Sequence, residues 1–256
     1  MSTFKRNSYA LVNDHWFAVL CSFVFLGAVL FIRIGFGFEF PIPWNDETAF
    51  ISQAFEYSQT GSFFVYGLNS ERVVMWMPPG YMLLLSGVYK IWGYSYELTR
   101  WISSLLYILS YGICLYIITN ALKGWRLKFA LACLLLAFIS PFSLAISNIA
   151  RMEALYTFLF LFSLLFALKG HIVLGLSVVL LSATVHYNAI YFLLPYAVFI
   201  VLKIAKQENL IVSAKELLTL SMVFILLLIY AFFILKNLDG FISDMKFQFA
   251  FKSIFQ

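Results

Sequence analysis

The feature that most constrains this chain is a series of long apolar runs with very few charged residues between them. Of 256 residues, 63% are apolar and only 11% are charged, whereas charged residues make up about a quarter of an ordinary soluble domain. Several runs reach the roughly 20 residues that a helix needs to cross the hydrocarbon core of a bilayer. The alternating segments of about ten residues that are typical of a transmembrane barrel do not occur. The sequence therefore predicts an all-α polytopic membrane protein.

We expect about five full transmembrane helices and one short helical hairpin. The first apolar run ends with Arg33 and has no small-residue cleavage site after it, so it is interpreted as a retained span and not as a signal peptide. The run 172–202 is too long for one span and has a polar middle, His186-Tyr187-Asn188, so it is interpreted as the hairpin. The run 79–92 is short for a crossing and is interpreted as a surface helix. The five expected spans are 16–34, 98–119, 127–147, 152–168 and 217–235.

The positions of the basic residues predict which side of the membrane each loop occupies. With this arrangement, nine of the 17 Lys and Arg residues fall in short segments on one side, as the positive-inside rule requires of the cytoplasmic side. We therefore expect a cytoplasmic N-terminus, with residues 35–97 forming a non-cytoplasmic loop. A bundle over 98–236 and an outer C-terminal segment over 237–256 complete one membrane domain, in the plasma membrane of a prokaryote. The nine residues are Lys5, Arg6, Lys123, Arg126, Lys128, Lys169, Lys203, Lys206 and Lys215.

The outer loop holds six of the 12 acidic residues, including the adjacent pair Asp46 and Glu47. Apolar residues at helical spacing follow the pair and predict a short helix. Asn45 is a suitable N-cap for this helix, and Gly61 is a suitable residue to end it. Acidic side chains in a first turn are commonly just helix-starting residues that complement the helix dipole. The alternative is a general base or metal ligand held at the boundary between water and membrane.

Two further positions in the sequence carry polar groups at membrane depth. Arg151 and Glu153 stand at the start of the span 152–168, and residues two apart on a helix do not face each other, so we expect them not to neutralise one another. They either snorkel to the interface or bind a substrate. His186 at the hairpin tip either lines a polar cavity or is satisfied by its neighbour Asn188.

Other patterns narrow the function classes. The three cysteines Cys21, Cys114 and Cys133 lie in apolar runs and predict neither a disulfide framework nor a metal site. The sequence has no glycine-rich phosphate loop, so no nucleotide cofactor is expected. Its basic residues are too dispersed to bind nucleic acid.

The order of these motifs resembles that of the GT-C glycosyltransferases, the polytopic enzymes that use polyprenyl-phosphate sugars and include protein O-mannosyltransferases and aminoarabinose transferases. The resemblance rests on the Asp46-Glu47 helix start, the surface helix after Pro78-Pro79-Gly80-Tyr81, Arg100 at the start of the second full span, the Arg151-x-Glu153 motif and the hairpin. It covers nearly the whole chain. Many members carry a charged residue or histidine before the double proline, where this chain has Trp76 and Met77.

The resemblance implies a site on the outer face. Asp46 would be the catalytic base that takes a proton from the acceptor as the acceptor attacks the sugar, and Glu47 would support the helix start. Glu153 would bind the acceptor or a divalent metal ion. The remaining implied substrate-binding residues are Arg72, Tyr81, Arg151 and His186.

Members of this class are usually longer than this chain. A truncated product, a half that needs a partner chain to supply missing helices, and a compact minimal enzyme all remain open. A transporter or flippase, with His186, Arg151 and Glu153 along its path, is the alternative from another class, although no internal repeat supports it. A non-catalytic partner subunit is the third possible function.

Overall fold

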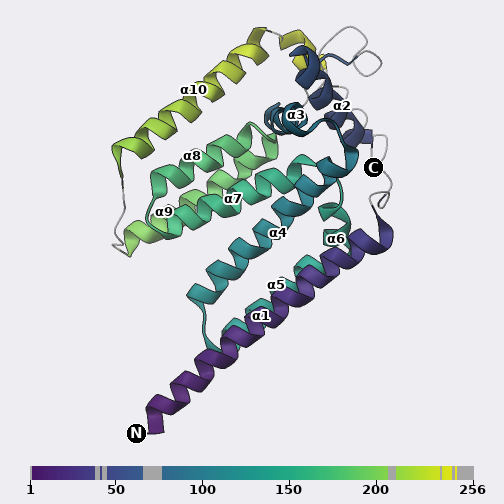
Figure 1. Cartoon of the computed structure of the whole chain (residues 1–256). Coiled ribbons are helices and arrows are strands. Elements are labelled where there is room, and N and C mark those ends of the chain that lie inside the picture. The colour runs from purple at the N-terminus through teal and green to yellow at the C-terminus, as the bar shows by residue number, and fades with distance from the viewer. Residues whose placement is uncertain are drawn as a thin grey trace. The chain divides into compact units, whose positions relative to one another are not determined.

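The computed structural model describes residues 2–37, 41, 45–65, 77–206, 212–236, 238–243 and 246. Within these residues every regular element is a helix (Figure 1), which confirms the predicted all-α class. The elements with defined bounds are α1 (Ser2–Phe36), α2 (Asn45–Thr60), α3 (Gly80–Trp92), α4 (Tyr96–Ala121), α5 (Gly124–Ile139), α6 (Pro141–Ser147), α7 (Met152–Leu168), α8 (Ile172–Ala183), the 3₁₀ helix η1 (Tyr187–Phe192), α9 (Leu193–Ala205) and α10 (Ala214–Lys236).

Four helical segments among the described residues are long and apolar enough to cross a membrane. They are the Trp16–Phe36 part of α1, α4, the continuous segment Tyr187–Ala205, and α10. The pair α5 and α6 makes a fifth if it is counted as one bent span. The predicted span 152–168 forms α7, which at 17 residues belongs to the shorter apolar helices.

The predicted hairpin over 172–202 has arms of unequal length. Its first arm, α8, has 12 residues, whereas the second runs for 19 residues from Tyr187 to Ala205. The difference arises because Tyr187 and Asn188, which we expected at an open tip, form the first turn of η1, and η1 continues directly into α9.

The predicted span 127–147 is broken at Ser140. Pro141 lacks a backbone N–H and disfavours helical backbone at the residue before it, so α5 ends there. The Ser140 hydroxyl oxygen then accepts a hydrogen bond from the Ser143 N–H at 3.3 Å and caps α6. The two helices meet at an angle of 61°.

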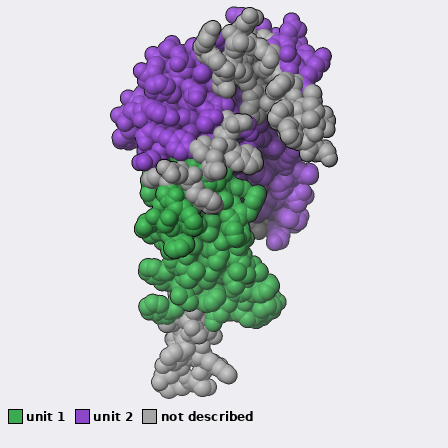
Figure 2. Space-filling view, turned by 90° about the vertical axis from the view of Figure 1, so that its right-hand side faces the viewer, with its two compact units in different colours: residues 1–43, 100–150 green, residues 44–99, 151–256 purple. Residues whose placement is uncertain are grey.

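The chain divides into two compact units, coloured separately in Figure 2. Unit 1 comprises residues 1–43 and 100–150, and unit 2 comprises residues 44–99 and 151–256. In unit 1, α1 packs along α5, and Phe25 of α1 stacks on Tyr111 of α4 with ring centroids 4.0 Å apart. Arg33 is buried in the same unit, where its guanidinium donates to the Arg100 carbonyl oxygen at 2.7 Å and lies over the Trp101 ring.

In unit 2, α7, α8 and α9 pack around a core that includes Ala167, Val179 and Tyr196, and α10 lies along α8 (Figure 1). The Tyr196 hydroxyl donates to the Ile172 carbonyl oxygen at 2.7 Å. Gly175 permits this packing, because a Cβ there would overlap the Tyr196 hydroxyl and lie 2.8 Å from the Ser163 carbonyl oxygen.

The two helices predicted in the outer loop also belong to unit 2. The structure confirms the helix after Asn45, which ends before Gly61, and the helix after the double proline, which ends before Gly93. Both glycines have positive φ, at +73° and +81°, a conformation that ends a helix at little cost only for glycine. α2 and α3 pack against each other.

Candidate functional site

Asp46 lies in the first turn of α2, with its side chain 44% exposed. The positive end of the helix dipole favours a negative charge at this position. The carboxylate is therefore accessible to a molecule that approaches the start of α2. The side chain of Asn45, the predicted N-cap, lies outside the described residues.

Arg151 and Glu153 form a two-point ion pair, which makes the prediction that they would not pair wrong. The Arg151 Nη2 atom lies 2.6 Å from Glu153 Oε1, and Nε donates to Oε2 at 3.1 Å. The prediction assumed that both residues are helical. Arg151 instead precedes α7 with extended backbone, φ −126° and ψ 151°, so its side chain folds back onto the first turn.

The same guanidinium connects the start of α7 to the start of α2. Arg151 Nη2 lies 3.9 Å from Asp46 Oδ2, so the two motifs that the sequence separates by more than 100 residues meet in unit 2. The Arg151 side chain is 24% exposed, which places the pair at the surface of the unit. Asp46, Arg151 and Glu153 together carry a net charge of −1 when all three are ionised.

Glu47 points into the unit instead of toward solvent. Its side chain is fully buried, and its Oε2 atom accepts a hydrogen bond from the Tyr96 hydroxyl at 3.1 Å. Burial raises the pKa of nearby Tyr89 to about 12, and the charge of Glu47 acts in the same direction. Burial of Glu47 fits the supporting role that the resemblance implies and keeps its carboxylate from meeting a substrate in this conformation.

Tyr81 and His186 occupy positions different from those expected of substrate-binding residues. Tyr81 is fully buried between α3 and α2, with its ring edge-on to Phe50. His186 is buried, its Nδ1 atom accepts from the Asn188 N–H at 2.9 Å, and its ring lies 5.1 Å from that of Tyr156. His186 thereby caps η1, which agrees with the simpler of the two sequence interpretations. Direct substrate contact by either residue stays a prediction.

A cavity of about 660 Å³ lies within unit 2 and is lined almost entirely by apolar side chains. Its volume falls within the range of about 300–1,000 Å³ that is typical of ligand sites. Its walls come from the end of α2 and from α3, α7, α8 and α10. Leu155 and Leu159 carry the lining toward the start of α7, where Leu155 follows Glu153 by two residues, about 3 Å along the helix axis.

The predicted metal role of Glu153 is not favoured by its contacts. Both Glu153 oxygens contact the Arg151 guanidinium, which also lies between Glu153 and Asp46, so a cation would have to displace it. Among the described residues, no group of three or more His, Cys, Asp or Glu side chains is arranged to hold a metal ion. Arg72, the remaining predicted substrate-binding residue, lies outside the described residues.

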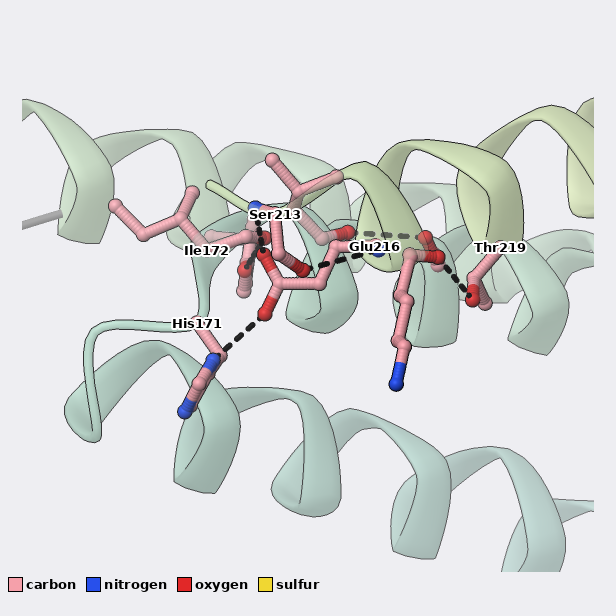
Figure 3. Close-up of polar contacts among 9 residues, drawn as sticks. His171, Ile172, Ser213, Glu216 and Thr219 are labelled. Atoms are coloured by element: carbon pink, nitrogen blue, oxygen red, sulfur yellow. Dashed lines mark hydrogen bonds and ion pairs between the residues drawn. The ribbon is translucent and has the colours of Figure 1, made fainter. Parts of the chain in front are cut away.

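The sequence analysis missed a polar contact between His171 and Glu216, which Figure 3 shows. His171 Nδ1 lies 2.6 Å from Glu216 Oε1, joining the turn between α7 and α8 to the first turn of α10. Glu216 Oε2 accepts from the Ser213 N–H at 3.3 Å, and the Ser213 hydroxyl oxygen accepts from the Glu216 N–H at 3.2 Å. These two hydrogen bonds form a reciprocal capping box. Its sequence pattern, Ser-x-x-Glu at the start of α10, could have been recognised from the sequence alone.

Comparisons with protein-family models, with curated proteins and with solved structures found no match for this chain.

Proposed function

We propose that this chain is a membrane glycosyltransferase of the GT-C type that moves a sugar from a polyprenyl-phosphate donor to an acceptor on the non-cytoplasmic face. The observation that carries the proposal is the meeting of Asp46 with Arg151, a partly exposed carboxylate beside a guanidinium. The transfer reaction needs one group that accepts a proton and another that stabilises the charge of a departing phosphate.

In the proposed reaction the acceptor's hydroxyl or amine attacks the anomeric carbon of the sugar. Asp46 takes the proton of that group while the new bond to carbon forms. The bond from the anomeric carbon to the phosphate oxygen breaks, and its electron pair stays on the polyprenyl phosphate. Arg151 offsets the negative charge on this leaving group, because a guanidinium matches the geometry of phosphate oxygens.

The apolar cavity supports a lipid-linked donor. It belongs to the same unit as Asp46 and Arg151, and its lining would suit a hydrocarbon chain and not a polar substrate. A donor whose apolar tail enters this cavity would leave its phosphate near the polar ends of the surrounding helices. The expected direction of binding, tail inward and phosphate outward, follows from the cost of burying a charge without a partner.

Replacing the proposed base is the direct test. Asp46→Asn keeps the shape of the side chain but removes its capacity to accept a proton, so we expect transfer from a radiolabelled polyprenyl-phosphate sugar to fall by at least 100-fold in isolated membranes. The matched control is Glu97→Gln, an exposed carboxylate in the first turn of α4, which should retain activity. Undiminished transfer by Asp46→Asn at normal abundance would refute the assignment.

A flippase is the second candidate, favoured by the break between α5 and α6. Helices interrupted within the membrane are typical of transporters, and these two meet at 61° beside Pro141. Lipid-linked substrate moving across sealed vesicles, with no transfer to any acceptor, would select this candidate.

A further inference from the structure

The partly buried hydrogen bond between Tyr96 and Glu47 affects the more exposed residue beside Glu47, Asp46. We propose that Tyr96 is a positioning residue for Asp46: by holding Glu47, it fixes the direction in which Asp46 points and thereby its approach to Arg151. This inference rests on the proposed function, in which Asp46 is the base.

The geometry of α2 transmits the effect. Asp46 and Glu47 are consecutive residues of one helical turn, so their side chains leave the helix about 100° apart. Glu47 is fully buried and accepts from the Tyr96 hydroxyl at 3.1 Å, while Asp46 is 44% exposed and faces Arg151. A rotation of α2 that released Glu47 would therefore also move Asp46 relative to the guanidinium.

Tyr96 is itself held in place by the turn before it. It is the first residue of α4, and the Ser95 hydroxyl oxygen caps that helix by accepting from the Leu98 N–H at 3.2 Å. One turn further on, buried Thr99 shares a hydrogen bond of 2.5 Å with the Tyr89 hydroxyl of α3. Tyr96, which binds Glu47, therefore belongs to a hydrogen-bonded junction between α3 and α4.

The contact also has a purely structural interpretation, in which Tyr96 adds stability and Asp46 takes the same position without it. Tyr96→Phe separates the two, because it removes one hydroxyl and keeps the ring. A positioning role changes the surroundings of residue 46, whereas a structural role changes only the resistance to unfolding.

Thiol reactivity at position 46 measures the surroundings directly. In Asp46→Cys, a nearby guanidinium favours the reactive thiolate, so the cysteine should react rapidly with a membrane-impermeant maleimide at neutral pH. Combining Asp46→Cys with Arg151→Gln removes the guanidinium, so this double variant gives the slowest reaction rate that we expect. The unsubstituted chain, which contains Cys21, Cys114 and Cys133, supplies the background to be subtracted.

We expect Asp46→Cys combined with Tyr96→Phe to react at least threefold more slowly than Asp46→Cys alone, approaching the rate with Arg151→Gln. Tyr94→Phe is the matched control, an exposed tyrosine two residues away that packs on Phe55 and Tyr89, and should leave the rate unchanged. An unchanged rate with Tyr96→Phe would overturn the proposal.

The kinetics of a variant that retains Asp46 give a second, independent test of the proposal. Tyr96→Phe should lower kcat roughly tenfold or more with little change in KM for the donor, because a small misplacement of a reacting group is costly. If the unsubstituted chain transfers no sugar, the proposed function fails, but the maleimide rates still decide whether Tyr96 positions residue 46.

Discussion

Arg151 shows how the backbone of one residue selects its partners. Its extended conformation before α7 lets one guanidinium contact Glu153 through two atoms and approach Asp46 of another helix. A helical Arg151 would point away from Glu153. The terminus of α7 therefore determines the charge environment of the proposed base.

Replacing this arginine by lysine tests the need for its planar group. Arg151→Lys keeps the charge but cannot contact both Glu153 oxygens and Asp46 with one rigid fork, so we expect transfer to fall about tenfold. The free energy of unfolding should change by less than about 1 kcal/mol, because the ion pairs are partly exposed. Initial rates and thermal unfolding in detergent measure the two effects, and a large loss of stability with full activity would contradict the assignment.

At the scale of elements, the start of α3 depends on a glycine. The Gly80 N–H donates to the Thr184 carbonyl oxygen at the end of α8 at 2.7 Å. A Cβ at position 80 would lie 2.6 Å from that oxygen, closer than real contacts permit. The double proline determines where α3 begins, and the absence of a side chain at Gly80 lets the start of α3 pack against the end of α8.

Two alanine substitutions in α3 should have opposite effects. Gly80→Ala should destabilise the protein by about 1–3 kcal/mol, because backbone must move to relieve the overlap. Gly87→Ala adds the same methyl group where nothing lies within 4 Å, so it should stabilise α3 by up to about 1 kcal/mol. Thermal unfolding in detergent compares them, and equal shifts would show that the approach to Thr184 is unimportant.

For the molecule as a whole, the distribution of charge predicts two chemically distinct sides. The basic residues that we expect in the cytoplasm include Lys206 at the end of α9, and the acidic outer loop includes α2. This orientation is the condition on which an outward-facing site depends.

Cysteine accessibility in intact cells checks this orientation. A membrane-impermeant maleimide should label Gln59→Cys, at an exposed position near the end of α2, and should label Lys206→Cys only after the cells are opened. The reverse pattern would place Asp46 on the cytoplasmic side and remove the basis for a reaction on the outer face.

The sequence by itself determined the all-α class and the bounds of α2 and α3, because apolar content, prolines and glycines act through the local backbone. It also marked Asp46, Arg151 and Glu153 as chemically unusual. Only the tertiary structure decided that Arg151 meets Asp46 and that Glu47 and Tyr81 are buried. These outcomes depend on which face of each helix packs against its neighbours, and the uniformly apolar helices of a membrane protein carry little periodicity from which that face can be read.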